Sequence, residues 1–111
     1  MIKVDVDPGI CGFKTTIRIY PKDSQISRVE IQTECPDIKK MEKEVEEVDA
    51  YTEIFSKIGE SPVYSLARKH CNHAACPVPM AILKGIEVAS GLALPKDVKI
   101  KIEKTEEEKA G

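Results

Sequence analysis

Apolar and polar residues alternate through the first third of the chain, and this period of two constrains the fold more than any other feature. The alternation covers residues 2–7, resumes over 13–19 and returns over 29–33. Successive side chains of a β-strand point to opposite sides, so each stretch predicts a strand with one apolar face. A fourth alternating stretch, residues 98–103, lies near the end of the chain. Alternation on one side only is typical of an antiparallel or mixed sheet that is covered on one face.

Three stretches with helical spacing predict the elements that cover this face. The first begins at Pro36, and its apolar residues recur every three or four positions as far as Val48. The second begins at Ser61-Pro62, a capping residue followed by proline at the first helical position. The third runs from about residue 77 to residue 90 and carries a strip of small residues that lets another backbone approach closely: Ala81, Gly85 and Ala89.

The predicted architecture is therefore a single two-layer α+β domain over residues 1–103. A four-stranded, mainly antiparallel sheet is covered on one face by three helices, in the order βββαααβ. Residues 104–111 form a charged end that we expect to fray.

Length and charge argue against several classes of protein. A chain of 111 residues is long enough for one core, and its net charge of −2, without a basic block, disfavours nucleic acid as a partner. No apolar run is long enough to cross a bilayer and no leader pattern precedes the first strand, so we expect a cytoplasmic protein that does not enter a membrane. We therefore expect any binding partner of this chain to be another protein, whose identity the sequence does not give. The oligomeric state stays open, and a homodimer could share a surface site.

The sequence favours a protein that is not an enzyme. It contains no phosphate loop, no nucleophile elbow and no pair of carboxylates at catalytic spacing. A cysteine–histidine hydrolase that uses Cys76 and His70 stays open as an alternative.

Four cysteines are the most distinctive residues of the chain: Cys11, Cys35, Cys71 and Cys76. In a reducing compartment this number points to metal or redox chemistry rather than to disulfides. None of the four lies inside a predicted helix or strand. Cys11 lies between Gly9 and Gly12 in a tight connection, where glycine permits unusual backbone angles.

Two of the cysteines directly precede a proline that begins a predicted helix, at Cys35-Pro36 and at Cys76-Pro77. A helix start presents unpaired N–H groups and a partial positive charge, which favour an anion. We therefore expect these two thiols to be biased towards thiolate, the form that binds metals and attacks electrophiles. Four residues are expected to shape the backbone around the candidate thiols: Gly12, Pro36, Pro77 and Pro79.

The same region holds the remaining soft donors. His73 and Cys76 are separated by two residues, so both side chains can converge on one ion where a loop turns into a helix. Three thiolates with one imidazole, or four thiolates, would complete a tetrahedral site for zinc or an iron–sulfur cluster, and the sequence does not choose between them. His70, in the last turn of a predicted helix, more simply interacts with the helix dipole. The expected ligands are three core thiols and one neighbour: Cys11, Cys35 and Cys76, with Cys71 or His73 as the fourth.

Three segments of the sequence resemble a family of small uncharacterised proteins that are found chiefly in anaerobic bacteria and archaea. These segments are "GICGF", "ECPDI" and "HAACPVPMAILKGIEVASGLALPKDV", and together they extend from Gly9 to Val98. The resemblance implies a domain of this size and an anaerobic setting, and it implies no particular activity.

Two shorter resemblances concern chemistry. The stretch "CPVPMAILK" is similar to the Cys-Pro-x-Pro motif of the TusA/SirA-like sulfur carriers, which implies a persulfide on Cys76 with Pro77 and Pro79 behind it. The layout of cysteine and histidine along the chain is similar to that of IscU/NifU-type iron–sulfur scaffolds. That similarity implies ligand roles for Cys35, His73 and Cys76, with Cys11 as a further ligand.

Three functions are therefore open at this point. The preferred one is a small metal-binding protein that holds zinc or an iron–sulfur cluster. The first alternative is a sulfur carrier that uses Cys76 as its persulfide. The second is a structural or interaction domain whose cysteines stay reduced in the core.

Overall fold

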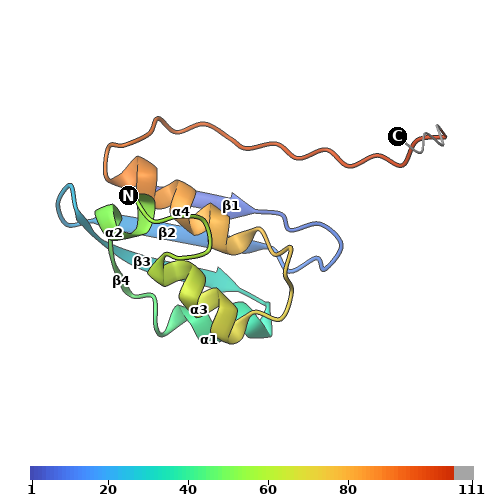
Figure 1. Ribbon diagram of the computed structural model, residues 1–111, viewed down its shortest axis with the longest axis horizontal. Coiled ribbons are helices and arrows are strands. Elements are labelled where there is room, and N and C mark those ends of the chain that lie inside the picture. The colour runs from blue at the N-terminus through green and yellow to red at the C-terminus, as the bar shows by residue number, and fades with distance from the viewer. Residues whose placement is uncertain (107–111) are drawn as a thin grey trace.

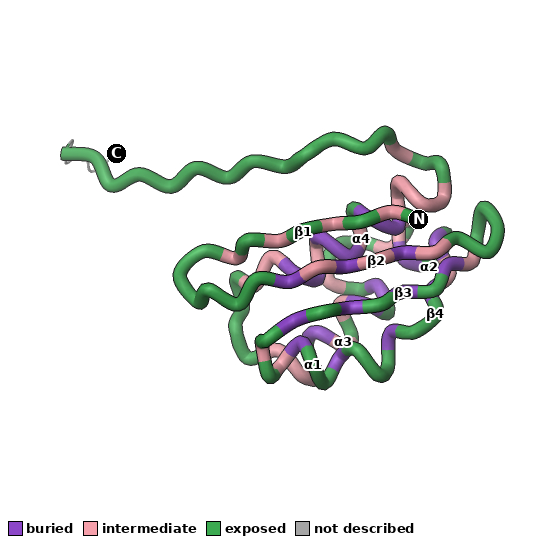
Figure 2. The backbone as a smooth tube through the Cα atoms, turned by 180° about the vertical axis from the view of Figure 1, so that it is seen from behind, coloured by how far each residue is buried: buried purple, intermediate pink, exposed green. Residues whose placement is uncertain are grey.

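The computed structural model describes residues 1–106 and contains one sheet with helices packed on one of its faces (Figures 1 and 2). The elements follow in the order β1 (Ile2–Val6), β2 (Thr15–Pro21), β3 (Ile26–Thr33), α1 (Pro36–Glu42), β4 (Glu47–Asp49), α2 (Ala50–Ile54), α3 (Pro62–His70) and α4 (Val78–Ala89). The strands lie side by side as β1-β2-β3-β4, and every neighbouring pair is antiparallel. The predicted α+β class and the four-stranded antiparallel sheet are confirmed.

The core lies between the inner face of the sheet and the helices. In β2 and β3 every second residue is buried, and Ile17 pairs with Ile31 while Ile19 pairs with Val29. Helix α4 packs on β1 and β2, whereas α1 packs on β3 and α3. In Figure 2 the strands in front alternate between buried and more exposed residues, as a sheet covered on one side must.

The fourth strand is not where the sequence predicts it. Residues 47–49 pair with β3 and close that side of the sheet, whereas residues 98–103 have no strand conformation. The observed order is βββαβααα rather than βββαααβ. The segment after α4 instead leaves the domain as an extended tail (Figure 1). Of the charged end predicted for residues 104–111, residues 107–111 lie outside the described part of the chain.

The helix predicted over residues 36–48 also ends early, and α2 was not predicted. Val45 and Val48 continue the helical spacing and are buried, but they reach the core from a turn and from β4. Three glutamates, at positions 44, 46 and 47, would crowd the negative end of a longer helix. A turn avoids this repulsion while it keeps both valines buried.

The strip of small residues on α4 serves contact with the sheet. A Cβ atom at Gly85 would lie 2.5 Å from Cδ1 of Ile19 and 2.9 Å from Cγ2 of Val4, so only glycine lets the helix come this close. Replacement of Gly85 by Ala should destabilise the protein by about 1 kcal/mol, because overpacking costs about 1–3 kcal/mol and the gain in helix propensity offsets about 1 kcal/mol of that cost. Urea unfolding measures this change, with the exposed Lys84→Ala on the same helix as control. A Gly85→Ala protein as stable as the wild type would contradict it.

The first turn of helix α3 donates a hydrogen bond to a buried carboxyl group, that of Glu53. Ser61 caps the helix by accepting a hydrogen bond from the Tyr64 N–H at 3.3 Å, and Glu53 of α2 accepts one from the Val63 N–H at 3.0 Å. Glu53 is only 4% exposed. Burial raises its pKa above the usual 4.5, with a small further rise from Asp49, and outweighs the lowering by the two polar contacts at Val63 and Ser61.

The raised pKa of Glu53 predicts a pH dependence of stability. The folded protein holds the proton more tightly than the unfolded chain, so this contribution is complete below pH 4.5 and is lost as the pH rises through the folded-state pKa. The variant Glu53→Gln keeps an oxygen for the Val63 N–H and cannot ionise. We expect it to lose this fall in stability and to be at least as stable as the wild type at neutral pH. Unfolding midpoints across the acid range test this, and an unchanged slope in the variant would contradict it.

Candidate functional site

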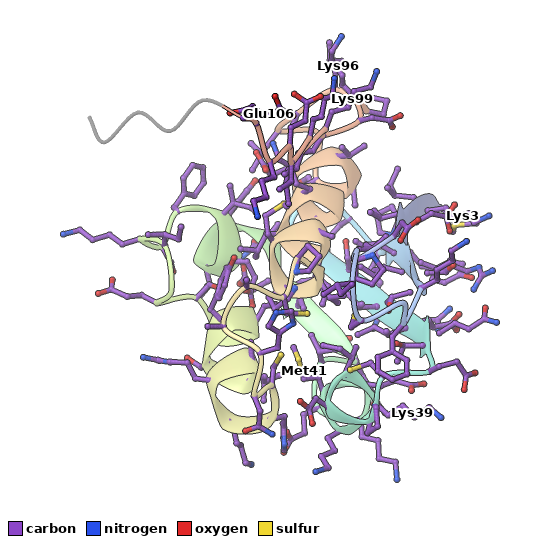
Figure 3. The ribbon with its side chains drawn as sticks, turned by 90° about the vertical axis from the view of Figure 1, so that its right-hand side faces the viewer. Lys3, Lys39, Met41, Lys96, Lys99 and Glu106 are labelled. Carbon is purple, nitrogen blue, oxygen red and sulfur yellow. The ribbon has the colours of Figure 1, made fainter. Side chains whose placement is uncertain are left out.

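All four cysteines lie at one end of the molecule. They are on the β1–β2 connection, between β3 and α1, directly after α3 and just before α4. These segments all lie towards the right-hand end of the domain in Figure 1. Figure 3 looks onto this end, where sulfur atoms lie between the helices close to the labelled Met41.

Cys35 is the N-cap residue of α1, and its backbone is fixed from both sides. Its N–H donates to Oγ1 of Thr33 at 3.1 Å, and its carbonyl accepts the Lys39 N–H at 3.0 Å. The sulfur makes no capping hydrogen bond, and the side chain is half-buried against the core. Pro36 occupies the first helical position, as predicted. The thiol of Cys35 is therefore held in place without being used by the helix.

Cys71 ends α3, and the loop that follows is tied to α1. The Cys71 N–H donates to the carbonyl of Ala67 at 2.8 Å, and its sulfur lies 3.6 Å from the carbonyl oxygen of His73. The Asn72 N–H donates to Oδ2 of Asp37 at 3.0 Å, which attaches the loop to the first turn of α1. The start of α1 and the end of α3 are thus held together at the site.

Cys76 lies among the other two thiols. Its N–H donates to the His73 carbonyl at 3.0 Å, which closes a tight turn just before α4. Burial is the main cause that raises its pKa to about 11, the Val78 N–H lowers it, and the neighbouring Cys71 and Cys35 raise it further. Cys35, Cys71 and Cys76, which we call the thiol cluster, therefore come together from three separate segments.

The expected thiolate bias at Cys76 is wrong for the chain without a bound ion. The start of α4 does act in the predicted direction, through the Val78 N–H. It is outweighed because the sulfur is half-buried and because two further thiols lie beside it. The free Cys76 is therefore a neutral thiol at physiological pH.

The structure does not place Cys11 in the thiol cluster. Cys11 is exposed on the connection between β1 and β2, where Gly9 and Gly12 both have positive φ angles, 91° and 72°. The Gly12 N–H donates to the carbonyl of Gly9 at 3.0 Å and closes the turn.

The two histidines occupy different environments. His73 is exposed, and its backbone carbonyl rather than its imidazole organises the loop. The imidazole of His70 contacts Glu44, whose pKa is lowered first by His70 and then by Lys69. His70 therefore joins the end of α3 to the turn after α1, in agreement with a structural role.

The hydrogen-bonding groups that position the thiols were not predicted from the sequence. A line of hydrogen bonds runs from the Cys35 N–H to Thr33, on to the Thr15 hydroxyl at 2.8 Å, and from there to the Phe13 carbonyl at 3.2 Å. Asp37 performs the same function for the loop after α3. Only the position of Asp37 in the first turn of a helix that follows Cys-Pro could have pointed to it.

Within residues 1–106, all four cysteines are free thiols, and no three His, Cys, Asp or Glu side chains are arranged to hold a metal ion. The thiol cluster is a group of close soft donors rather than a finished coordination sphere. The described residues also contain no helix long and apolar enough to cross a membrane.

The chain matches the model of a known protein family. A family model matches residues 2–102, almost the whole sequence. The chain belongs to DUF6951, a family of unknown function. Membership in an uncharacterised family is what the three longer motifs predicted. No curated protein and no solved structure matches this DUF6951 protein significantly.

The contrast between Cys11 and Cys76 predicts their order of alkylation. With a pKa of about 11, roughly one Cys76 in a thousand is a thiolate at pH 8, and the thiolate is the form that reacts. We expect iodoacetamide to modify the exposed Cys11 at least tenfold faster than Cys76. Peptide mapping by mass spectrometry measures both rates, and the unfolded chain is the control in which the difference should disappear. Preferential modification of Cys76 would contradict the prediction.

Proposed function

We propose that this DUF6951 protein binds a thiophilic metal, zinc or an iron–sulfur cluster, through Cys35, Cys71 and Cys76. The observation that carries the proposal is the meeting of these half-buried thiols from three segments around Cys76. Thiolate sulfur is the preferred ligand of both zinc and iron–sulfur clusters. Compared with the set expected from sequence, Cys71 replaces Cys11 as one of the three main ligands, and Cys11 becomes a candidate for the fourth.

The backbone around the thiol cluster supports this proposal because most of it is ordered without help from the metal. The Cys35 N–H, the Cys71 N–H and the Cys76 N–H all have backbone or hydroxyl acceptors within 3.1 Å. The bond from Asn72 to Asp37 holds two of the three segments together. With this backbone ordered, binding of an ion requires rotation of the three thiols, approach of a fourth ligand and loss of protons. Metal uptake should therefore release protons and strengthen as pH rises.

The fourth ligand is proposed to be Cys11 or His73. Cys11 lies at the same end of the molecule, on a glycine-flanked connection that is open to solvent. His73 lies in the loop between two members of the cluster, and its imidazole is exposed. Either side chain would turn three thiolates into a tetrahedral set.

The sulfur-carrier alternative has less support. A persulfide carrier needs a Cys76 thiolate that accepts sulfur readily, whereas burial and the two neighbouring thiols hold this thiol in its protonated form. The interaction-domain alternative agrees with the packing of Cys35, Cys71 and Cys76 against the core. It differs from the metal proposal because it predicts a metal-free protein after anaerobic purification.

Anaerobic purification followed by metal and sulfide analysis tests the proposal. We expect either about one zinc per chain, without colour, or iron and acid-labile sulfide in similar amounts with broad visible absorbance. Each of Cys35→Ser, Cys71→Ser and Cys76→Ser should lower the bound metal at least tenfold. His70→Gln is the matched control, because His70 is beside the site but contacts Glu44. A metal-free wild type, or full loading of all three serine variants, would overturn the proposal.

Cobalt(II) substitution identifies the fourth ligand in the same proteins. Four thiolates give more intense sulfur-to-cobalt charge transfer than three thiolates with an imidazole. We therefore compare Cys11→Ser with His73→Gln, and the variant that lacks the fourth ligand should change the spectrum while the other leaves it unaltered.

A further inference from the structure

The segment that follows α4 carries apolar side chains into solvent. Val98, Ile100 and Ile102 are 50%, 70% and 90% exposed, and they alternate with charged residues over the tail segment, residues 96–103. This is the pattern of a strand with one apolar face, but among residues 1–106 no strand pairs with it. The radius of gyration, 15.0 Å, exceeds the value of about 13 Å expected for a compact chain of this length. The tail segment thus has the side-chain pattern of a strand without a strand partner.

The sheet has an unused edge on the same side. β1 is the outermost strand, and among the described residues its outer edge has no hydrogen-bonded neighbour. Its inward side chains Ile2, Val4 and Val6 are only half covered by α4. An exposed edge with apolar side chains is a template for pairing with another strand.

A groove of about 1080 Å³ separates this edge from the tail segment. Apolar side chains lie on both walls, Val4, Val6 and Met80 on one side and Leu94, Val98 and Ile100 on the other, and charged residues of β1, α4 and the tail segment line the groove between them. The tail runs above β1 in the same direction as that strand in both views (Figures 1 and 2). The groove therefore lies between β1 and the tail segment, which run in the same direction. A strand that entered the groove in the opposite direction would be antiparallel to both.

A second copy of the chain supplies such a strand. When the tail segments of two copies run antiparallel across a twofold axis, each lies in the groove of the other, between β1 and the tail. The sheets then join in the order β4-β3-β2-β1-tail-tail-β1-β2-β3-β4, with every pair antiparallel. We propose that this protein forms a twofold dimer in which the tail segment of each chain pairs with the free edge of β1 in the other chain.

The side chains on both faces agree with this pairing. Val98, Ile100 and Ile102 would extend the apolar face formed by β1, and Lys99 and Lys101 would then lie on the opposite face. That face of β1 carries Lys3 and Asp5, and Asp7 directly follows the strand. Asp5 already accepts from the Thr16 hydroxyl and lies 3.6 Å from Lys3 Nζ, so Asp7 is the carboxylate most open to the lysines of the incoming strand. The exchange is reciprocal and closes on itself, so it forms a dimer rather than a fibre.

Light scattering of the full chain under reducing conditions tests the mass, since reductant excludes intermolecular disulfides. We expect twice the chain mass of 12.3 kDa. Ile100→Pro removes a backbone donor from the tail strand and should weaken dimerisation at least tenfold, whereas Ile100→Val should leave it unchanged. Ile100 is mostly exposed in the single chain, so neither variant should unfold the domain. A monomeric wild type, or an Ile100→Pro protein that dimerises normally, would overturn the proposal.

Zero-length cross-linking distinguishes exchange from closure of the tail on its own chain. The ¹⁴N and ¹⁵N proteins are unfolded together and refolded as a mixture, so that mixed dimers can form. The mixture is then treated with a carbodiimide, and peptides that join Lys99 or Lys101 to Asp5 or Asp7 are sequenced. The proposal expects peptides with one light and one heavy half. Cross-links only within one isotope would show that the tail covers its own β1 and would overturn it.

Discussion

The antiparallel pairing of β2 with β3 positions the thiol cluster. Its register sets Thr15 opposite Thr33 at the end of the sheet, where the two buried hydroxyls are 2.8 Å apart. The Thr33 hydroxyl also accepts the Cys35 N–H, while the Thr15 hydroxyl donates to the carbonyl of Phe13. A shift of one residue in this register would move every side chain of the strand to the other face and would break both links. Leaving even one of these buried groups unpaired costs about 1–3 kcal/mol, so the pairing fixes where α1 begins and hence where Cys35 lies.

The protonation state of Cys76 depends on two opposing effects of different size, the helix start on one side and burial with neighbouring thiols on the other. A helix start stabilises a nearby anion by roughly 0.3–1 kcal/mol, which is less than one pKa unit of about 1.36 kcal/mol. Half-burial and two neighbouring thiols act in the other direction and raise the pKa from 9.0 to about 11. The Cys-Pro motif indicates only the smaller effect, because burial and the approach of Cys35 depend on contacts between residues far apart in sequence. A cation at the cluster would reverse the balance, since its charge favours all three thiolates at once.

Sequence patterns predicted the elements whose residues follow one period throughout. The strands β2 and β3 keep strict alternation, α3 begins at the Ser61 cap and α4 ends just before Gly91, so these elements were found within three residues of their observed bounds. The segment after α1 was wrongly predicted to be helical because Val45 and Val48 fit the helical period. In the structure residues 47–49 pair with β3 as a strand. Val98, Ile100 and Ile102 satisfy the period of a strand, yet a strand forms only where an edge is within reach. The cysteine-rich loop was located, and Cys71 was underrated because nothing local shows that its sulfur faces Cys76.

The strand directions in the proposed dimer keep the two thiol clusters apart. β1 runs towards the end of the molecule that carries the thiol cluster. In the proposed dimer the β1 strands of the two copies are antiparallel, so the two clusters lie at opposite ends of the joined sheet. A site shared across the dimer, which the sequence left open, is then excluded by the strand directions. Each chain would hold its own metal, and loss of the tail contact would leave metal binding intact while loss of the thiols would leave the dimer intact.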